Sequence, residues 1–229
     1  MSDQTNNLSQ AVQDYLKAIY TLAQRHGQPV GTTQLAAHLA LTPASVTGMV
    51  QKLARQAPPL LRYEKHRGVS LTAEGETAAL HIIRRHRLLE TLLHDTLGYG
   101  WDEVHEEAER LEHALSPALT QRIADVLGNP RHDPHGQPIP TRELQLPPRP
   151  AAMALAALPV GETAVLHHVR DEDAAVLRQL AALGLRPGTR LTLQARTAAH
   201  LILLLNGRAD PILLPAALAN HIFLEAYTP

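Results

Sequence analysis

The 229-residue sequence contains no cysteine, which excludes disulfide bonds and thiolate metal sites. Any metal ligand must therefore be imidazole, carboxylate or backbone oxygen. Long apolar runs are also missing, because the stretch from Leu201 to Leu205 is far too short to cross a bilayer and the N-terminus lacks a signal-peptide pattern. We expect a cytoplasmic protein with no membrane contact.

A strong net charge is missing as well, since the formal charge is −1. The whole molecule therefore gives no electrostatic case for nucleic acid, but its charges are unevenly placed. The only lysines, Lys17, Lys52 and Lys65, lie near the N-terminus, whereas acids gather between residues 90 and 112. This asymmetry indicates a basic binding module followed by an acidic sensing module.

Three helices are predicted near the N-terminus. Apolar residues at helical spacing mark the first, over residues 9–26. Thr32 or Thr33 is expected to cap a short second helix, and Thr42 followed by Pro43 is typical of the start of a third. Two apolar runs after these helices, joined by a turn that ends at Gly68, predict a β-hairpin. Residues 1–74 should therefore form a winged helix-turn-helix.

The rest of the chain divides into two further regions. Helical patterns over residues 73–97, 102–115 and 117–127 predict a helical middle domain, which we bound at 75–145, and a proline-rich linker follows at 146–154. Residues 155–229 alternate β-like runs with one helix and suit a small β-barrel. The runs are 163–169, 191–195, 201–205 and 222–226, and the helix is 174–183. The fold class is thus mainly α with a small β domain.

The third helix and the hairpin turn carry the candidate DNA contacts. A recognition helix presents its N-terminal side chains to base edges while nearby basic residues neutralise phosphates. The candidates are Thr42, Pro43, Ser45, Thr47, Lys52 and Arg55 on the helix, and Lys65, His66 and Arg67 in the turn. Gly48 offers no side chain, so we expect few direct hydrogen bonds to bases and a larger part for DNA shape. A winged helix that makes only protein contacts is the alternative.

The segment HEEAERLEH, residues 105–113, predicts a metal site. At about 100° per residue, His105, Glu109, Glu112 and His113 fall within roughly one third of the helix circumference. Two carboxylates one turn apart repel each other unless a cation neutralises them. A second imidazole–carboxylate pair, formed by His86 and Glu90, lies one turn apart on the preceding helix and should face the first. The alternative is a solvated acidic helix face.

These segments carry a resemblance to a known family. The chain resembles the DtxR/MntR family of metal-dependent transcriptional repressors over nearly its whole length, through QDYLKAIYTL, TPASVTGMVQKL, YEKHRGVSLTAEG, RHRLLETLL, HEEAERLEH, DPHGQPIP and ALGLRPG. The resemblance implies an N-terminal winged helix, a helical dimerisation and metal-binding domain, and a C-terminal SH3-like domain. It also implies a homodimer without enzymatic activity that binds a palindromic double-stranded DNA operator, with Mn(II) or Fe(II) as co-repressor.

The resemblance also implies two metal sites. The primary site would comprise Asp14, Glu109, Glu112 and His113, and the ancillary site His86, Glu90 and His105, with Asp171, Glu172 and Asp173 as further candidates. Glu109 and Asp14 stand where iron-responsive relatives carry cysteine or methionine, and such oxygen ligands suit Mn(II), although Fe(II) stays open. Lys17 stands where manganese-responsive relatives usually have a glutamate, so we expect one primary ion rather than a close pair.

Two other functions stay open at this point. A winged-helix regulator could respond to another ligand and ignore metal. A metalloenzyme is less favoured, because HEEAE is not the zinc-protease motif H-E-x-x-H and no pair of Glu-x-x-His motifs is present.

Overall fold

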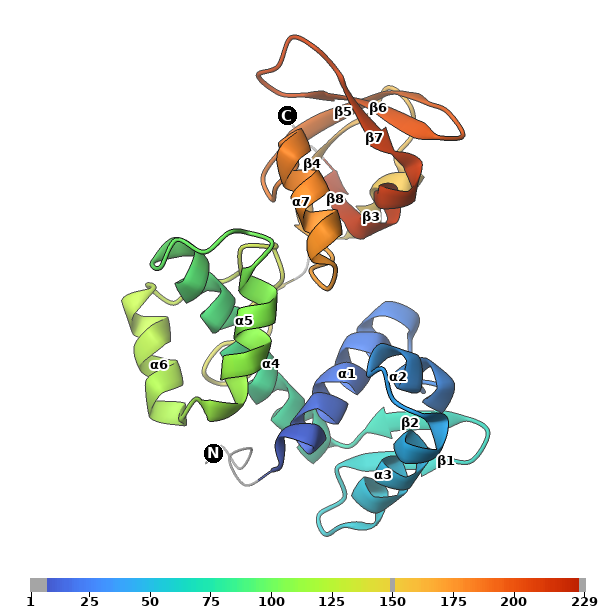
Figure 1. Cartoon of the computed structure of the whole chain (residues 1–229), viewed down its shortest axis with the longest axis vertical. Helices are drawn as coiled ribbons and strands as arrows, with labels where there is room; N and C mark the ends of the chain where they lie inside the picture. The colour runs from blue at the N-terminus through green and yellow to red at the C-terminus, as the bar shows by residue number, and fades with distance from the viewer. Residues whose placement is uncertain (1–7, 149–150, 227–229) are drawn as a thin grey trace.

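The structure, a computed structural model, describes residues 8–148 and 151–226 and consists of three regions. Figure 1 shows them as a blue-to-cyan N-terminal region, a green helical middle and an orange-to-red β region. The first contains α1 (Gln10–His26), α2 (Thr32–His38), α3 (Pro43–Arg55), β1 (Leu61–Glu64) and β2 (Gly68–Leu71). The predicted winged helix-turn-helix is confirmed.

The helix starts show which cap predictions hold. Thr42 caps α3 as predicted, and its hydroxyl accepts a hydrogen bond from the Ser45 amide at 3.2 Å. The prediction of Thr32 or Thr33 as the cap of α2 is wrong, because Gly31 takes that position and α2 already begins at Thr32. Both threonines lie in the first helical turn, since the chain turns into the helix one residue earlier than the sequence pattern indicated.

The hairpin packs closely on the chain before α2. Its strands pair antiparallel from Leu61 opposite Leu71 to Glu64 opposite Gly68, and Val69 bridges Val30. Gly68 has φ +122°, and a Cβ there would lie 2.4 Å from the Val30 carbonyl oxygen. Only glycine fits this position. The close approach holds the wing against the helix-turn-helix.

A single long helix, α4 (Ala73–Asp95), belongs to two hydrophobic cores. Its first half contributes Ala79 and Ile82 to the N-terminal core, together with Leu16 of α1. Its second half contributes Leu88 and Leu93 to the core of the middle region. One continuous helix therefore connects the winged helix-turn-helix to the helices that follow.

The middle region continues with α5 (Val104–Leu111), the 3₁₀ turn η2 (Glu112–Ala114) and α6 (Pro117–Val126). The prediction of one helix over 102–115 is too long at both ends: residues 102 and 103 form a turn before α5, and the backbone tightens into a 3₁₀ turn at Glu112. Pro117 keeps the preceding residue out of the helical conformation, and Ser116 is accordingly extended with ψ 155°. The last turn before it closes as a 3₁₀ helix, which places Glu112 and His113 on a narrower turn than an α-helix gives.

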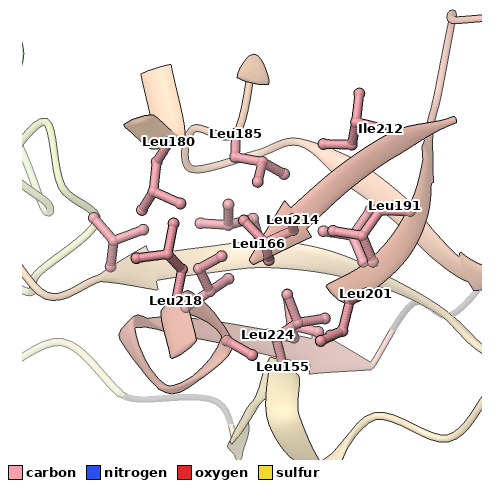
Figure 2. Close-up of a cluster of buried hydrophobic side chains, with 14 of the residues drawn as sticks. Leu155, Leu166, Leu180, Leu185, Leu191, Leu201, Ile212, Leu214, Leu218 and Leu224 are labelled. Carbon is pink, nitrogen blue, oxygen red and sulfur yellow. The ribbon is translucent and has the colours of Figure 1, made fainter. Parts of the chain in front are cut away.

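The C-terminal region is a six-stranded antiparallel sheet with one covering helix. Its elements are β3 (Ala152–Ala154), η3 (Leu155–Ala157), β4 (Thr163–Val169), α7 (Ala174–Leu183), β5 (Arg190–Arg196), β6 (His200–Leu205), β7 (Ile212–Pro215), η4 (Ala216–His221) and β8 (Ile222–Ala226). The strand order is β3-β8-β4-β5-β6-β7. Leucines on alternate strand positions, such as Leu201 and Leu214, point into a shared core with Leu180 of α7 (Figure 2). The four predicted strands and the helix are present, whereas β3 and β7 were not predicted and β3 lies inside the predicted linker.

The C-terminal region docks on the middle one through Trp101 and the segment 131–140, which we call the strap. Trp101 is 3% exposed and belongs to the C-terminal core. The Val169 amide at the end of β4 donates to the His135 carbonyl at 3.0 Å. A Cβ on Gly136 would lie 2.1 Å from the backbone oxygen of His167, so strap and strand touch backbone to backbone. Within the described residues, no helix has the length and apolar character needed to span a membrane.

Candidate metal centre

Two elements far apart in the sequence form the first ligand group. Asp14 projects from α1, and Glu112 and His113 come from η2. His113 Nε2 lies 3.0 Å from Asp14 Oδ1 and 3.6 Å from Glu112 Oε1. Gln13 fixes the other side of the His113 ring, because its Oε1 lies 3.0 Å from Nδ1. We call Asp14, Glu112 and His113 the α1 group; it joins the winged helix-turn-helix to the middle region.

The second group lies on the facing sides of α4 and α5. His86 Nε2 is 3.0 Å from Glu90 Oε1 and 3.2 Å from His105 Nδ1. Glu109, expected in the primary site, lies instead with these imidazoles, 3.7 Å from His105 Nε2 and 3.8 Å from His86 Nδ1. The structure therefore brings the predicted ancillary residues together, and it groups the ligand atom of Glu109 with His86 and His105.

The strap adds two ligands that the sequence reasoning missed. Asp133 and His135 lie close enough to Glu90 for all three to hold one ion, and all three are buried. Asp133 Oδ1 accepts from the amides of His135 and Gln137, both at 2.9 Å, which fixes the turn. The short Asp-x-His spacing within DPHGQPIP was the available signal, but nothing local indicates that this turn reaches α4.

The three acids after β4 have different environments. Asp171 lies with Glu90 and His105 in a group that could hold an ion. Glu172 instead forms an ion pair with Arg25 of α1. Asp173 caps α7, where its Oδ1 accepts from the amides of Ala175 and Val176. Of the three candidates, only Asp171 belongs to a group whose ligand atoms lie close enough to hold one ion. We call Glu90, His105, Asp133, His135 and Asp171 the strap group.

Buried donor atoms test whether these residues fit a cation. Within the described residues, Glu90 Oε2, Asp133 Oδ2 and His135 Nδ1 are buried without a hydrogen-bond partner. Leaving such atoms unpaired is costly, and all three belong to the strap group. A cavity of about 740 Å³ opens beside the α1 group and the strap group. Its lining includes Asp14, His86, His105, Glu109 and Asp171. The donor chemistry and the access from solvent fit a divalent ion.

A lysine lies among the carboxylates. Lys17 Nζ is 2.7 Å from Glu109 Oε1 and 2.6 Å from Glu112 Oε1. Burial by itself lowers the pKa of Lys17, but the charges of Glu112 and Glu109 outweigh that effect, so its pKa lies above the usual value. Lys17 therefore stays charged and binds α1 to α5 and η2.

The buried charges shift the ligand pKa values strongly. Burial lowers the pKa of His86, yet Glu90 and Glu112 raise it to about 10. Burial likewise lowers the pKa of His135, whereas the negative charge of Glu90, whose Oε1 lies 3.7 Å from Nδ1, raises it to about 10. Burial raises the pKa of Glu90, but His86 holds it well below the usual range. Burial and the charge of Glu90 raise the pKa of Asp133 to about 7. The carboxylate charges thus favour the protonated form of both imidazoles, so a metal ion would compete with those protons.

The candidate DNA contacts lie on the surface. Lys52 and Arg55 of α3 and the hairpin-turn residues 65–67 are exposed. The Thr47 hydroxyl donates to the Pro43 carbonyl at 2.8 Å, and the Thr42 hydroxyl is engaged as a cap. Two of the short polar candidates thus already use their hydroxyls within the helix, which favours contacts through methyl groups. A winged helix coupled to carboxylate and imidazole clusters is typical of metal-responsive DNA-binding proteins.

Comparisons with known proteins agree with this class. Residues 7–69 match the family described as the iron dependent repressor N-terminal DNA binding domain, and residues 72–141 match its metal binding and dimerisation domain. Residues 153–226 match the FeoA domain. The chain is 32% identical to the iron-dependent repressor IdeR of Mycobacterium leprae (strain TN), over 96% of this chain and 99% of that protein.

Solved structures give the same result. A manganese-dependent transcriptional repressor in complex with manganese is 40% identical, with a TM-score of 0.86 over 94% of this chain and 100% of that one. ScaR with bound Zn²⁺ is 30% identical, with a TM-score of 0.78 over 94% of this chain and 99% of that one. The chain belongs to the iron-dependent repressor family, the DtxR/MntR family of metal-dependent transcriptional repressors.

Proposed function

We propose that this repressor senses Mn(II) or Fe(II), and that the ion acts as co-repressor. Asp14, Glu112 and His113 would hold the primary ion, and His86 together with the strap group would hold an ancillary ion. When bound, a divalent ion supplies the positive charge that allows these carboxylates to converge. In this proposal the α1 group is the switch, because it alone includes a residue of the DNA-binding region.

One contact carries the proposal. His113 Nε2 lies 3.0 Å from Asp14 Oδ1, so a ligand on η2 meets a ligand on α1. α1 packs into the same core as Val46 and Val50 of α3, the recognition helix. Fixing Asp14 therefore fixes the orientation of α3 relative to the middle region, which converts ligand binding into DNA affinity.

The expected DNA target follows from symmetry. In a homodimer, two recognition helices related by a two-fold axis read half-sites one or more helical turns apart, and the operator is then palindromic. The match to a dimerisation domain over residues 72–141 supports this arrangement. A protein that binds chromosomal DNA in this way acts in the cytoplasm.

The donor set favours certain metals. All candidate ligands are oxygen or imidazole nitrogen, and such sites lack the soft sulfur that strengthens binding of copper and zinc. The carboxylates of the α1 group suit Mn(II), while similarity both to an iron-dependent and to a manganese-dependent repressor keeps Fe(II) beside it. Metal binding is proposed here as regulatory rather than catalytic.

The test is operator binding with and without metal. An operator is selected from random duplex DNA by the Mn(II)-treated protein, and its affinity is measured with Mn(II), anaerobic Fe(II), Co(II), Zn(II) and chelator. Wild type should bind tightly with Mn(II) or Fe(II) and weakly with chelator, whereas Asp14→Asn should lose the metal response. Asp210→Asn, an exposed loop change of the same chemistry, is the matched control. Equal affinity with metal and chelator would favour the metal-independent regulator instead.

A further inference from the structure

Lys17 lies at the point where α1 meets α5 and η2. It follows Asp14 by almost one helical turn, so both side chains leave α1 on the same side. Its side chain is 16% exposed, and that of Glu112 is fully buried. A buried carboxylate needs a compensating charge, and here the ammonium supplies it.

The ammonium bridges two carboxylates. Its Nζ contacts Glu109 Oε1 at 2.7 Å and Glu112 Oε1 at 2.6 Å. Two carboxylates that converge on one point from successive helical turns form the kind of position that a divalent cation can fill. Lys17 fills that position with a charge that is covalently attached to α1.

The same carboxylate oxygen takes part in the α1 group. Glu112 Oε1 also lies 3.6 Å from His113 Nε2, on the side that faces Asp14. An ion held by Asp14, Glu112 and His113 would therefore share Glu112 with the lysine. A second divalent ion between Glu109 and Glu112 would have to displace the ammonium or lie against it, and like charges at that separation repel strongly.

We propose that Lys17 is a tethered cation that takes the second cation position between Glu109 and Glu112, so that the α1 group binds a single divalent ion. This inference rests on the proposed metal-sensing function and assigns the number of ions at its switch. Lys17 also holds the Glu109 carboxylate beside that of Glu112, so the second cation position lies next to the α1 group. The lysine is thus a positioning residue that sets stoichiometry.

Ion counting tests the proposal. Bound Mn(II) per protomer is measured at saturation by equilibrium dialysis in the full-length wild type, Lys17→Glu and Lys17→Gln. Both variants should bind one more Mn(II) per protomer than wild type, with the glutamate variant the tighter of the two. Arg110→Glu changes an exposed cation on α5 by the same charge and should leave the count unchanged. Lys17→Gln adds no acid, so it covers the case in which Lys17→Glu fails to fold.

Electron paramagnetic resonance gives a second measurement. In Lys17→Glu, two Mn(II) ions bridged by carboxylates should give an exchange-coupled spectrum, and the wild type should lack it. A coupled pair in the wild type, or equal ion counts in wild type and in both variants, would overturn the inference while leaving metal sensing intact. Binding of neither Mn(II) nor anaerobic Fe(II) by any of the proteins would overturn the inference and the proposed function together.

Amine labelling tests whether Lys17 stays between the carboxylates or is displaced when Mn(II) binds. In the proposed arrangement Lys17 stays between the carboxylates when Mn(II) is bound, so its modification by an amine reagent, followed by mass spectrometry, should stay as slow as with chelator. A marked acceleration of Lys17 labelling on Mn(II) addition would mean that the ion expels the lysine, and the proposal would be wrong.

Discussion

The middle region has two interfaces, which we call seams, and they differ in the contacts that hold them. One lies between α1 and α5 with η2, and the other between the middle region and the C-terminal region. The seam with α1 is polar: it contains Lys17 and Asp14, and the Asp14 side chain is 41% exposed. The seam with the C-terminal region buries the Trp101 ring and a His135 side chain that solvent does not reach. The first is held by charges, and the second by packing and backbone hydrogen bonds.

This difference indicates which seam moves. Charges that meet at a partly exposed surface can be rearranged by a cation, whereas a packed aromatic contact is either formed or broken. We therefore expect α1 to respond to metal while the C-terminal region stays docked. His86 connects the two seams, because its Nδ1 lies 2.6 Å from Glu112 and its Nε2 lies 3.0 Å from Glu90.

The largest effect should come from breaking the packed seam. In Trp101→Ala, the lost ring leaves a cavity in the C-terminal core, and large aromatic truncations of this kind cost about 3–5 kcal/mol. The readout is amide hydrogen exchange of Val169, whose N–H donates to His135 across the seam. Its protection should fall by an amount that corresponds to that energy.

Tyr99→Ala, at a 41% exposed position two residues away, provides the control for this change. It should leave the Val169 exchange rate close to that of the wild type. If Trp101→Ala also left it unchanged, the seam would be held by something other than this packing.

The next effect should come from the polar seam. Glu112 contacts Lys17, His86 and His113, so Glu112→Gln removes a charge shared by the whole α1 group. Operator affinity at saturating Mn(II) should fall toward the chelator value, by about 5–150-fold for a typical allosteric coupling. Fluorescence anisotropy with labelled operator measures it, and the exposed Glu106→Gln on α5 should bind like wild type. If Glu112→Gln kept full operator affinity, the polar seam would not be what couples metal binding to DNA binding.

Stability and Mn(II) affinity should both depend on pH, because the ligand imidazoles hold protons that the metal must replace. The pKa values of His86 and His135 are raised from 6.5 to about 10, so their contribution to stability is complete below pH 6.5 and is lost as pH rises through about 10. An imidazole must lose its proton to bind a metal, so Mn(II) uptake should release protons, and affinity should rise with pH in this window. Calorimetric titration with Mn(II) in two buffers of different ionisation enthalpy counts the protons released.

His86→Gln should reduce this proton release by about one proton per protomer if the ring loses its proton on metal uptake. Proton release that stays the same in the variant, or no release in the wild type at pH 7.5, would mean that His86 is neutral before the metal arrives.

The sequence predicted the parts of this structure that depend on local spacing. Thr42 and Pro43 mark the start of α3 because capping is a property of a few adjacent residues. His86 and Glu90 were paired correctly because residues one turn apart share a helix face. The grouping of Glu109 with His86 and His105 was not predicted, because it depends on contacts between helices, among them that of Lys17 with both Glu109 and Glu112.

The strap could not be predicted in this way. It has no regular hydrophobic period, and its position depends on contacts with residues about 50 positions earlier. Arg84 and Arg87 of α4 donate to the carbonyls of Pro140 and Pro138, and these bonds draw the strap across the helix. Asp133 consequently lies beside Glu90, a proximity that spacing alone does not reveal.

The smallest effect should come from the surface charges of the packed seam. Arg178 of α7 donates to Asp102 at 3.2 Å, but its side chain is 61% exposed, and solvent and salt screen such pairs. Arg178→Ala should therefore destabilise docking by only about 0.2–1 kcal/mol, measured by the same Val169 exchange. Asp102→Ala and the double variant complete a cycle that isolates the pair. A coupling well above this range would mean that charge, and not the buried Trp101 ring, holds the C-terminal region, and the contrast between the two seams would no longer stand.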